Sequence, residues 1–178
     1  MIKKQALAQE IQAASLLSGE FKLRSGQVSQ KYFDKYRFES QPLLLEKITK
    51  HLHELIPSST DFLAGLELGG VPIATALSLK SNIPSLFVRK KAKDYGTCKL
   101  AEGASDLKNK NLCLVEDVIT TGGQVAESCQ ALRDLGANVE HVLCVIYRGD
   151  FDHPDEETKL KALGLKVKAL FTLEDFNF

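Results

Sequence analysis

The chain has 178 residues, of which 44% are hydrophobic and 26% are charged, as in a soluble globular protein of one domain with a sizeable core. Lysine plus arginine and aspartate plus glutamate number 23 each, so no basic excess suggests nucleic-acid binding. No stretch approaches the roughly 20 apolar residues of a membrane span, and no signal-peptide core follows Met1, so we expect a cytoplasmic protein without membrane or nucleic-acid partners.

The first part of the chain predicts two amphipathic helices with a hairpin between them. Apolar residues recur at helical spacing over residues 3–17. Residues 21–34 alternate in places and turn at Ser25-Gly26, which predicts a hairpin. Helical spacing of leucine and isoleucine returns over residues 42–56, before a proline that ends the pattern.

From Phe62 onward, short apolar runs alternate with helical ones. This alternation predicts an α/β fold with a mostly parallel central sheet flanked by helices. No repeat or linker interrupts it, so a single domain over residues 1–178 is expected. The expected strands cover residues 62–66, 84–88, a run that begins at 112, 141–147 and 165–172, and the expected helices cover residues 71–80, a segment that ends at 135, and 154–163.

An apolar run, an acidic pair and a glycine-rich turn follow one another in the middle of the chain. The run from Leu112 breaks at Glu116-Asp117, and a Thr-Thr-Gly-Gly turn at residues 120–123 leads into a helical segment. Backbone amides of such a turn, with the positive end of the helix dipole, suit one phosphate group. The two carboxylates suit vicinal hydroxyls or a divalent cation held through water. An ordinary turn between strand and helix is the alternative interpretation.

The longest segment without apolar periodicity runs over residues 89–103. Its first five residues, Arg-Lys-Lys-Ala-Lys, carry four positive charges. In a neutral protein such a segment suits an anionic ligand, and Gly96 and Gly103 could act as the hinges of a lid. A solvated basic loop is the alternative.

The cysteines and histidines do not indicate a metal site. No C-x-x-C spacing is present, and Cys113, Cys129 and Cys144 lie in segments expected to be buried, where they suit small apolar positions. Cys98 lies in the polar loop and is expected to be exposed.

The acidic pair and its turn resemble the signature of type I phosphoribosyltransferases, which bind 5-phosphoribosyl-1-diphosphate (PRPP). Three further segments resemble orotate phosphoribosyltransferases in particular. They are the basic segment 89–96, similar to that family's catalytic loop, the hairpin 25–34, and Arg148, which follows an apolar strand. The resemblance spans residues 20–150. It implies transfer of ribose 5-phosphate from PRPP to orotate in pyrimidine biosynthesis, with Mg²⁺ as cofactor and a homodimer with shared active sites.

The resemblance also implies roles for individual residues. Lys93, Arg89 and Asp117 are expected to be catalytic, with Lys93 stabilising charge on the leaving diphosphate. Orotate is expected to lie against Tyr32, Phe33, Thr120 and Arg148. No direct protein ligand is expected for Mg²⁺, which PRPP would hold while the acidic pair acts through water. The expected PRPP-binding residues are Arg24, Leu68, Gly69, Arg89, Lys90, Lys93, Tyr95, Glu116, Asp117, Val118, Ile119, Thr120, Thr121, Gly122, Gly123 and Gln124.

The implied architecture is the type I phosphoribosyltransferase fold, with a small N-terminal hood at about residues 1–40 and a PRPP-binding core at about 41–178. Several positions depart from the family pattern. Arg24 stands where many members have lysine, Gln30 where proline is frequent, and Tyr95 where others have histidine. Leu68-Gly69 replaces Tyr-Lys of some members, which leaves only backbone donors for the diphosphate at that point.

Two other functions remain open at this stage. One is a phosphoribosyltransferase for another base, which would share the ribose-phosphate site; Lys93 and Arg148 argue against it. The other is a PRPP-sensing regulatory protein of the same fold, which should carry a basic face or an added DNA-binding module; the balanced charge and the short N-terminal helix of this chain argue against it.

Overall fold

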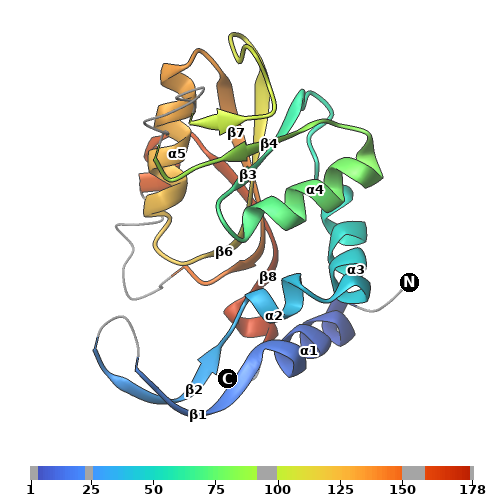
Figure 1. Ribbon diagram of the computed structural model, residues 1–178, viewed down its shortest axis with the longest axis vertical. Helices are drawn as coiled ribbons and strands as arrows, with labels where there is room; N and C mark the ends of the chain where they lie inside the picture. Colours follow the sequence, from blue (N-terminus) through green and yellow to red (C-terminus); the bar gives the residue numbers. More distant parts are fainter. Residues whose placement is uncertain (1–3, 23–25, 92–99, 150–158, 177–178) are drawn as a thin grey trace.

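A six-stranded, mostly parallel sheet forms the centre of the molecule (Figure 1). The computed structural model describes residues 4–22, 26–91, 100–149 and 159–176. The strand order is β5-β4-β3-β6-β7-β8, and all neighbours are parallel except β4 and β5. The strands are β3 (Phe62–Leu66), β4 (Ser85–Val88), β5 (Ala101–Glu102), β6 (Asn111–Ile119), β7 (Asn138–Tyr147) and β8 (Lys166–Thr172). The predicted α/β class and its mostly parallel sheet are confirmed.

Helices cover both faces of this sheet (Figure 1). On one face α1 (Lys4–Ser15), α2 (Tyr36–Glu39), α3 (Pro42–His53) and α4 (Gly70–Ser81) enclose one core, which includes Phe38 and Ile48. On the other face α5 (Gly123–Asp134) covers a second core, which includes Cys129 and Leu132. The buried residues of β6 alternate between the two cores as far as Val115, because successive strand residues point to opposite faces.

The described elements differ from the predicted ones chiefly at their ends. Residues 16 and 17, predicted to end the first helix, open β1 (Leu16–Lys22), which pairs antiparallel with β2 (Val28–Phe33). Strand β7 begins at Asn138 rather than at His141, and β5 lies inside the segment predicted to be a long loop. Helix α2 and the 3-10 helix Leu173–Asp175 were not predicted, since four and three residues are too few to show periodicity.

Several predictions concern segments that the described ranges include only in part. Of the predicted helix 154–163, residues 159–163 are described; 159–162 are helical and 163 lies in a turn. The turn at Ser25 and the thiol of Cys98 lie outside the described residues. The three cysteines predicted to be buried are at most 1% exposed and belong to the two cores, as expected. Within the described ranges, no helix is long and apolar enough to cross a bilayer.

Gly70 brings the start of α4 into direct contact with the central strand. A Cβ atom at Gly70 would lie 2.1 Å from the Val115 carbonyl oxygen, which belongs to the backbone of β6. Gly70→Ala is therefore expected to lower the free energy of unfolding by about 1–3 kcal/mol, because the helix must move off the sheet. Equilibrium unfolding in urea measures this loss. Gly123→Ala is the control, because its Cβ would meet nothing closer than 3.7 Å; equal losses in the two variants would contradict the argument.

Candidate active site

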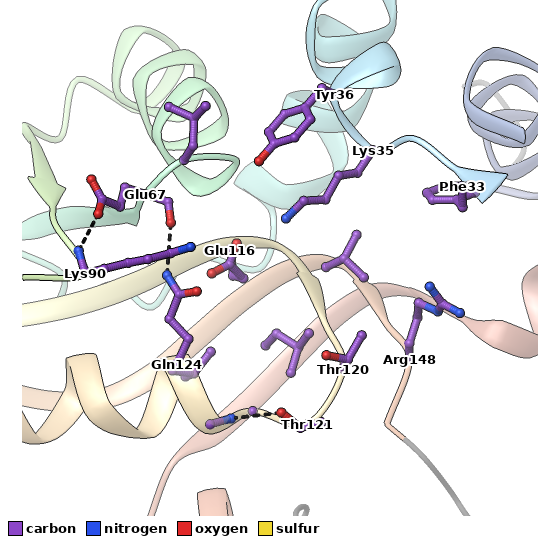
Figure 2. Close-up of a pocket in the computed structure, with 16 residues that line it drawn as sticks. Phe33, Lys35, Tyr36, Glu67, Lys90, Glu116, Thr120, Thr121, Gln124 and Arg148 are labelled. Carbon is purple, nitrogen blue, oxygen red and sulfur yellow. Dashed lines mark hydrogen bonds between the residues drawn. The ribbon is translucent and has the colours of Figure 1, made fainter. Parts of the chain in front are cut away.

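The site lies where the carboxyl ends of β3 and β6 meet. From β3 the chain continues to β4 on one side, and β6 continues to β7 on the other, so the order of the strands reverses between β3 and β6. Open α/β sheets bind ligands at such a switch point. A cavity of about 330 Å³ opens there, within the range of small-molecule sites. Figure 2 shows the residues that line it.

The turn between β6 and α5 forms one wall of the cavity. Residues 118–125 line it without a break, so the predicted cradle Thr120 to Gly123 faces the cavity. Gly122 is the N-cap of α5 and has a φ of 72°, a left-handed conformation that favours glycine. It provides no side-chain cap for the helix. The Gly123 backbone amide donates to Thr121 Oγ1 at 3.4 Å. The start of this twelve-residue helix lines the cavity with the positive end of its dipole, which suits a phosphate.

The two acidic residues of β6 occupy different surroundings. Glu116 lines the cavity, although only 6% of it is exposed. Asp117 is fully buried, is absent from the lining, and forms an ion pair with Lys35, with 2.7 Å between Nζ and Oδ2. The expectation that both carboxylates face the ligand assumed that the strand ends before them. In the structure β6 continues to Ile119, and neighbouring strand residues point to opposite faces.

Three carboxyl groups gather beside Lys35. Burial, a hydrogen bond with Asp117 and the charge of Asp117 raise the pKa of Glu39 to about 10 and that of Glu116 to about 9. Burial also favours the neutral form of Asp117, but hydrogen bonds from Glu116 and Glu39 and the charge of Lys35 outweigh it, so the pKa of Asp117 lies below its ordinary value. At neutral pH the cluster therefore holds one carboxylate, Asp117, and one ammonium group.

Glu39→Gln is expected to make stability less sensitive to pH. The folded protein keeps the Glu39 proton up to about pH 10, whereas the unfolded chain releases it near 4.5. Between these values the folded state binds more protons, so the free energy of unfolding falls as pH rises, by at most about 1.4 kcal/mol per pH unit. Glutamine removes this loss and can still donate to Asp117.

The measurement for Glu39→Gln is the melting temperature at pH 5 and at pH 8.5. We expect the variant to be more stable than the parent at pH 8.5 and to gain far less at pH 5. Glu46→Gln, an exposed position on α3, is the control and should shift both values equally. A gain of the same size at both pH values would show that Glu39 does not carry the proton.

The loop after β3 forms the opposite wall. The peptide bond between Glu67 and Leu68 is cis. Glu67 accepts hydrogen bonds from the Lys90 backbone amide, at 2.7 Å, and from Gln124 Nε2 through its carbonyl oxygen, at 2.9 Å (Figure 2). These contacts join the loop to the end of β4 and the start of α5. Gly69 lies behind the lining, and a Cβ there would be 1.8 Å from Asp117 Oδ2, so the loop packs directly on that carboxylate.

The residues expected to contact orotate are brought together only in part. Phe33, Thr120 and Arg148 line the cavity, and the guanidinium of Arg148 points toward Phe33 in Figure 2. The Arg148 backbone amide donates to the Ile119 carbonyl oxygen at 2.7 Å, which joins the ends of β7 and β6. Tyr32 does not line the cavity, because it stacks on Phe21 with 5.4 Å between ring centroids. Alternation along β2 separates it from Phe33.

Most of the described residues that the sequence assigned to PRPP line this one cavity. Leu68, Lys90, Glu116 and the run from Val118 to Gln124 do so. Arg89 instead faces Glu102, with 3.7 Å between Nε and Oε1. Arg24, Lys93 and Tyr95 lie outside the described residues, so their roles stay predictions.

The resemblance places residues 67–70 at the diphosphate loop, and Glu67 of that loop lines the cavity. The sequence assignment missed three lining residues: Lys35, Tyr36 and Val125. Val125 directly follows an assigned residue, so its position in the chain could have indicated it. Lys35 and Tyr36 directly follow the Tyr-Phe-Asp segment of the hairpin, and only the folding of that segment onto β6 reveals them.

Comparison with known proteins agrees with the architecture. The family model of the phosphoribosyl transferase domain matches residues 37–168. An orotate phosphoribosyltransferase of Nocardioides sp. is 51% identical over 171 residues, which cover 96% of this chain and 93% of the relative. One of Methanocella arvoryzae is 38% identical over 89% of this chain and 88% of the relative.

Solved structures show the same relation. The crystal structure of Mycobacterium tuberculosis orotate phosphoribosyltransferase with Fe(III) dicitrate has a TM-score of 0.84 at 28% identity and covers 98% of this chain and 99% of its own. The same enzyme in complex with PRPP has a TM-score of 0.78 at 26% identity, with 97% of each chain covered. Because the family model matches most of the chain and relatives match nearly its whole length, this chain belongs to the orotate phosphoribosyltransferase family.

Proposed function

We propose that this protein transfers the ribose 5-phosphate group of PRPP to orotate and releases diphosphate, giving orotidine 5'-monophosphate for pyrimidine biosynthesis. The observation that carries the proposal is the presence, in one cavity, of a helix start whose N-cap residue is glycine, a buried acid and an arginine. The turn at residues 120–123 suits the 5-phosphate, and Glu116 lies where the ribose hydroxyls would follow. Arg148 lies beyond Thr120, on the side away from Lys90 (Figure 2).

The reaction breaks the bond between C1 of the ribose and the diphosphate oxygen and forms a bond from C1 to the orotate ring nitrogen, which loses its proton. Positive charge develops on the ribose and negative charge on the departing oxygens, so catalysis is chiefly electrostatic. Lys90 lines the cavity on the diphosphate side, and Lys93 is proposed to add donors there. No strong base is required, because the ring N–H of orotate is already acidic.

Orotate is a planar ring with a carboxylate, and the wall near β7 suits both features. Phe33 offers an aromatic surface, and the guanidinium of Arg148 can bind a carboxylate through two parallel hydrogen bonds. This arrangement fixes the orientation of the ring, so that its nitrogen faces C1. Tyr32 would reach the base only if the hairpin changed its position.

Mg²⁺ is the proposed cofactor. Among the described residues, no group of three or more acidic, histidine or cysteine side chains is arranged to hold a metal alone. The ion would arrive with PRPP and take most of its ligands from the substrate, while Glu116, which lines the cavity, would hold one of its waters. When bound, the ion neutralises charge on the leaving group. A homodimer with shared active sites and a cytoplasmic location are further proposals, which rest on the family resemblance.

The test of the function is turnover by the purified protein. Orotate, PRPP and Mg²⁺ are supplied together and then each is withheld, while the loss of orotate absorbance and the mass of the product are followed. We expect orotidine 5'-monophosphate only when orotate and PRPP are both present, at a rate that depends on Mg²⁺. Faster turnover of adenine, hypoxanthine or uracil would favour another base phosphoribosyltransferase, and turnover of no base would favour a PRPP-binding regulator.

A further inference from the structure

A lysine from the N-terminal segment reaches the active-site cavity. Lys35 lies between β2 and α2, and its side chain is 34% exposed. Its Nζ lies 2.7 Å from Oδ2 and 3.0 Å from Oδ1 of Asp117, and it lines the cavity beside Tyr36 and Leu68. An ammonium group has three N–H donors. At most two of them serve Asp117, so at least one remains for a ligand in the cavity.

The wall opposite the phosphate cradle needs positive charge. If the 5-phosphate binds at residues 120–123, the diphosphate must lie across Glu116, near the loop after β3. That loop carries Glu67 and Leu68 and no cationic side chain. Gly69 leaves no space for one, because a Cβ there would collide with Asp117. Among the described residues that line the cavity, the cations are Lys35, Lys90 and Arg148.

Lys35 and Lys90 are the cations on the diphosphate side. In Figure 2 their side chains extend toward each other from opposite walls, above Glu116, whereas Arg148 lies beyond Thr120. The ion pair with Asp117 directs the Lys35 ammonium to this position and keeps it charged: burial alone would lower the pKa of Lys35, but the charge and hydrogen bond of Asp117 raise it overall.

We propose that Lys35 binds the diphosphate group of PRPP, and that Asp117 positions its ammonium group for this contact. Lys35 thus supplies from the N-terminal segment a charge that the loop after β3 does not provide. The inference rests on the proposed function, because it places the 5-phosphate at the 120–123 turn. It adds a substrate contact that the sequence assignment did not contain.

The test is the binding of three ligands to Lys35→Met by calorimetry: PRPP with Mg²⁺, diphosphate with Mg²⁺, and ribose 5-phosphate. Loss of a charge-assisted hydrogen bond is expected to lower the affinity of the variant for PRPP and for diphosphate at least about tenfold. Its affinity for ribose 5-phosphate, which lacks the diphosphate, should change less than about twofold. Lys35→Arg should restore part of the loss. Lys31→Met, an exposed lysine on β2, is the matched control and should bind all three ligands like the parent.

If Lys35 served only to hold Asp117 in place and did not contact the diphosphate, the three ligands would respond differently to Lys35→Met. In that case the affinity for ribose 5-phosphate would fall as much as the affinity for PRPP, because Asp117 lies beside the ribose end of the site. Equal losses for the three ligands, or no loss for diphosphate, would overturn the proposal. A parent protein that does not convert orotate and PRPP would refute the proposed function instead, so the two failures are distinguishable.

A second measurement uses the unaltered protein, because removing Lys35 leaves the buried charge of Asp117 unpaired and can prevent folding. The native protein is acetylated with acetic anhydride, and the modification of Lys35 and Lys31 is compared by mass spectrometry. PRPP with Mg²⁺ should protect Lys35 and leave Lys31 unchanged, whereas ribose 5-phosphate should protect neither. Equal modification of Lys35 with and without PRPP would overturn the proposal.

Discussion

Replacing Gly123 by aspartate is expected to weaken PRPP binding at least about 100-fold and to leave the fold intact. Gly123 is the first residue of α5, and a Cβ there would meet nothing closer than Thr121 Oγ1, at 3.7 Å. A carboxylate at this helix end interacts favourably with the dipole, by about 0.3–1 kcal/mol. The same carboxylate would occupy the space proposed for the 5-phosphate. Two like charges about 4 Å apart repel by roughly 4 kcal/mol at an effective dielectric constant of 20.

Gly123→Asn is the matched control, because it has nearly the same shape without the charge. Calorimetry with PRPP and with ribose 5-phosphate measures affinity, and thermal unfolding shows that both variants are folded. We expect the asparagine variant to lose far less affinity than the aspartate variant. Similar losses in the two variants would mean that crowding, not charge, is responsible. PRPP binding by Gly123→Asp at nearly the parent affinity would mean that the phosphate lies elsewhere.

The sequence predicted those parts of the fold whose signals are local. Strand β3 was predicted with the bounds that it has, because a short apolar run there is flanked by polar residues and glycine. The cradle between β6 and α5 was predicted for a similar reason. Its Thr-Thr-Gly-Gly turn stands directly between an apolar run and a helical one, so the chain order alone places the turn at a strand end.

Features that depend on contacts between distant segments were missed. Asp117 and Lys35 are 82 residues apart, and no local pattern indicates that they form an ion pair. The ion pair exists because the N-terminal segment folds over the face of β6 that carries Asp117, where Phe38 joins the same core as Val115. The roles of neighbours on one strand were assigned from resemblance without regard to which face each occupies. Glu116 and Asp117 were therefore both assigned to the ribose, although only Glu116 lines the cavity. Tyr32 and Phe33 were both assigned to orotate, although only Phe33 lines it.

This arrangement makes the N-terminal segment part of the active site. Phe33, Lys35 and Tyr36 line the cavity together with residues of the sheet, and Glu39 completes the buried carboxyl cluster. The segment thus closes the cavity at two places, near Arg148 and above Glu116 (Figure 2). Substitutions in this segment should therefore affect both substrates, orotate through Phe33 and PRPP through Lys35, whereas those at residues 121–123 of the turn should affect PRPP alone.

Arg148→Gln is expected to raise the orotate KM by about 10–100-fold, because the variant loses charge-assisted hydrogen bonds to the carboxylate. Arg148 lies at the end of β7, and its backbone is held by Ile119, so substitution of its side chain should not displace the cradle. PRPP affinity should therefore change little. Steady-state kinetics with orotate varied at saturating PRPP, together with calorimetry for PRPP, measures both quantities.

Two comparisons show whether Arg148 recognises the carboxylate itself. Arg148→Lys keeps the charge but lacks the planar pair of donors, so its orotate KM should lie between those of the parent and the glutamine variant. Uracil is orotate without the carboxylate, and its inhibition constant should be the same in the parent and in Arg148→Gln. If the variant binds uracil and orotate more weakly by the same factor, Arg148 maintains the shape of the base site and does not recognise the carboxylate. If orotate kinetics are unchanged, the carboxylate is bound by another residue, because a contact of this strength cannot be removed without effect on KM.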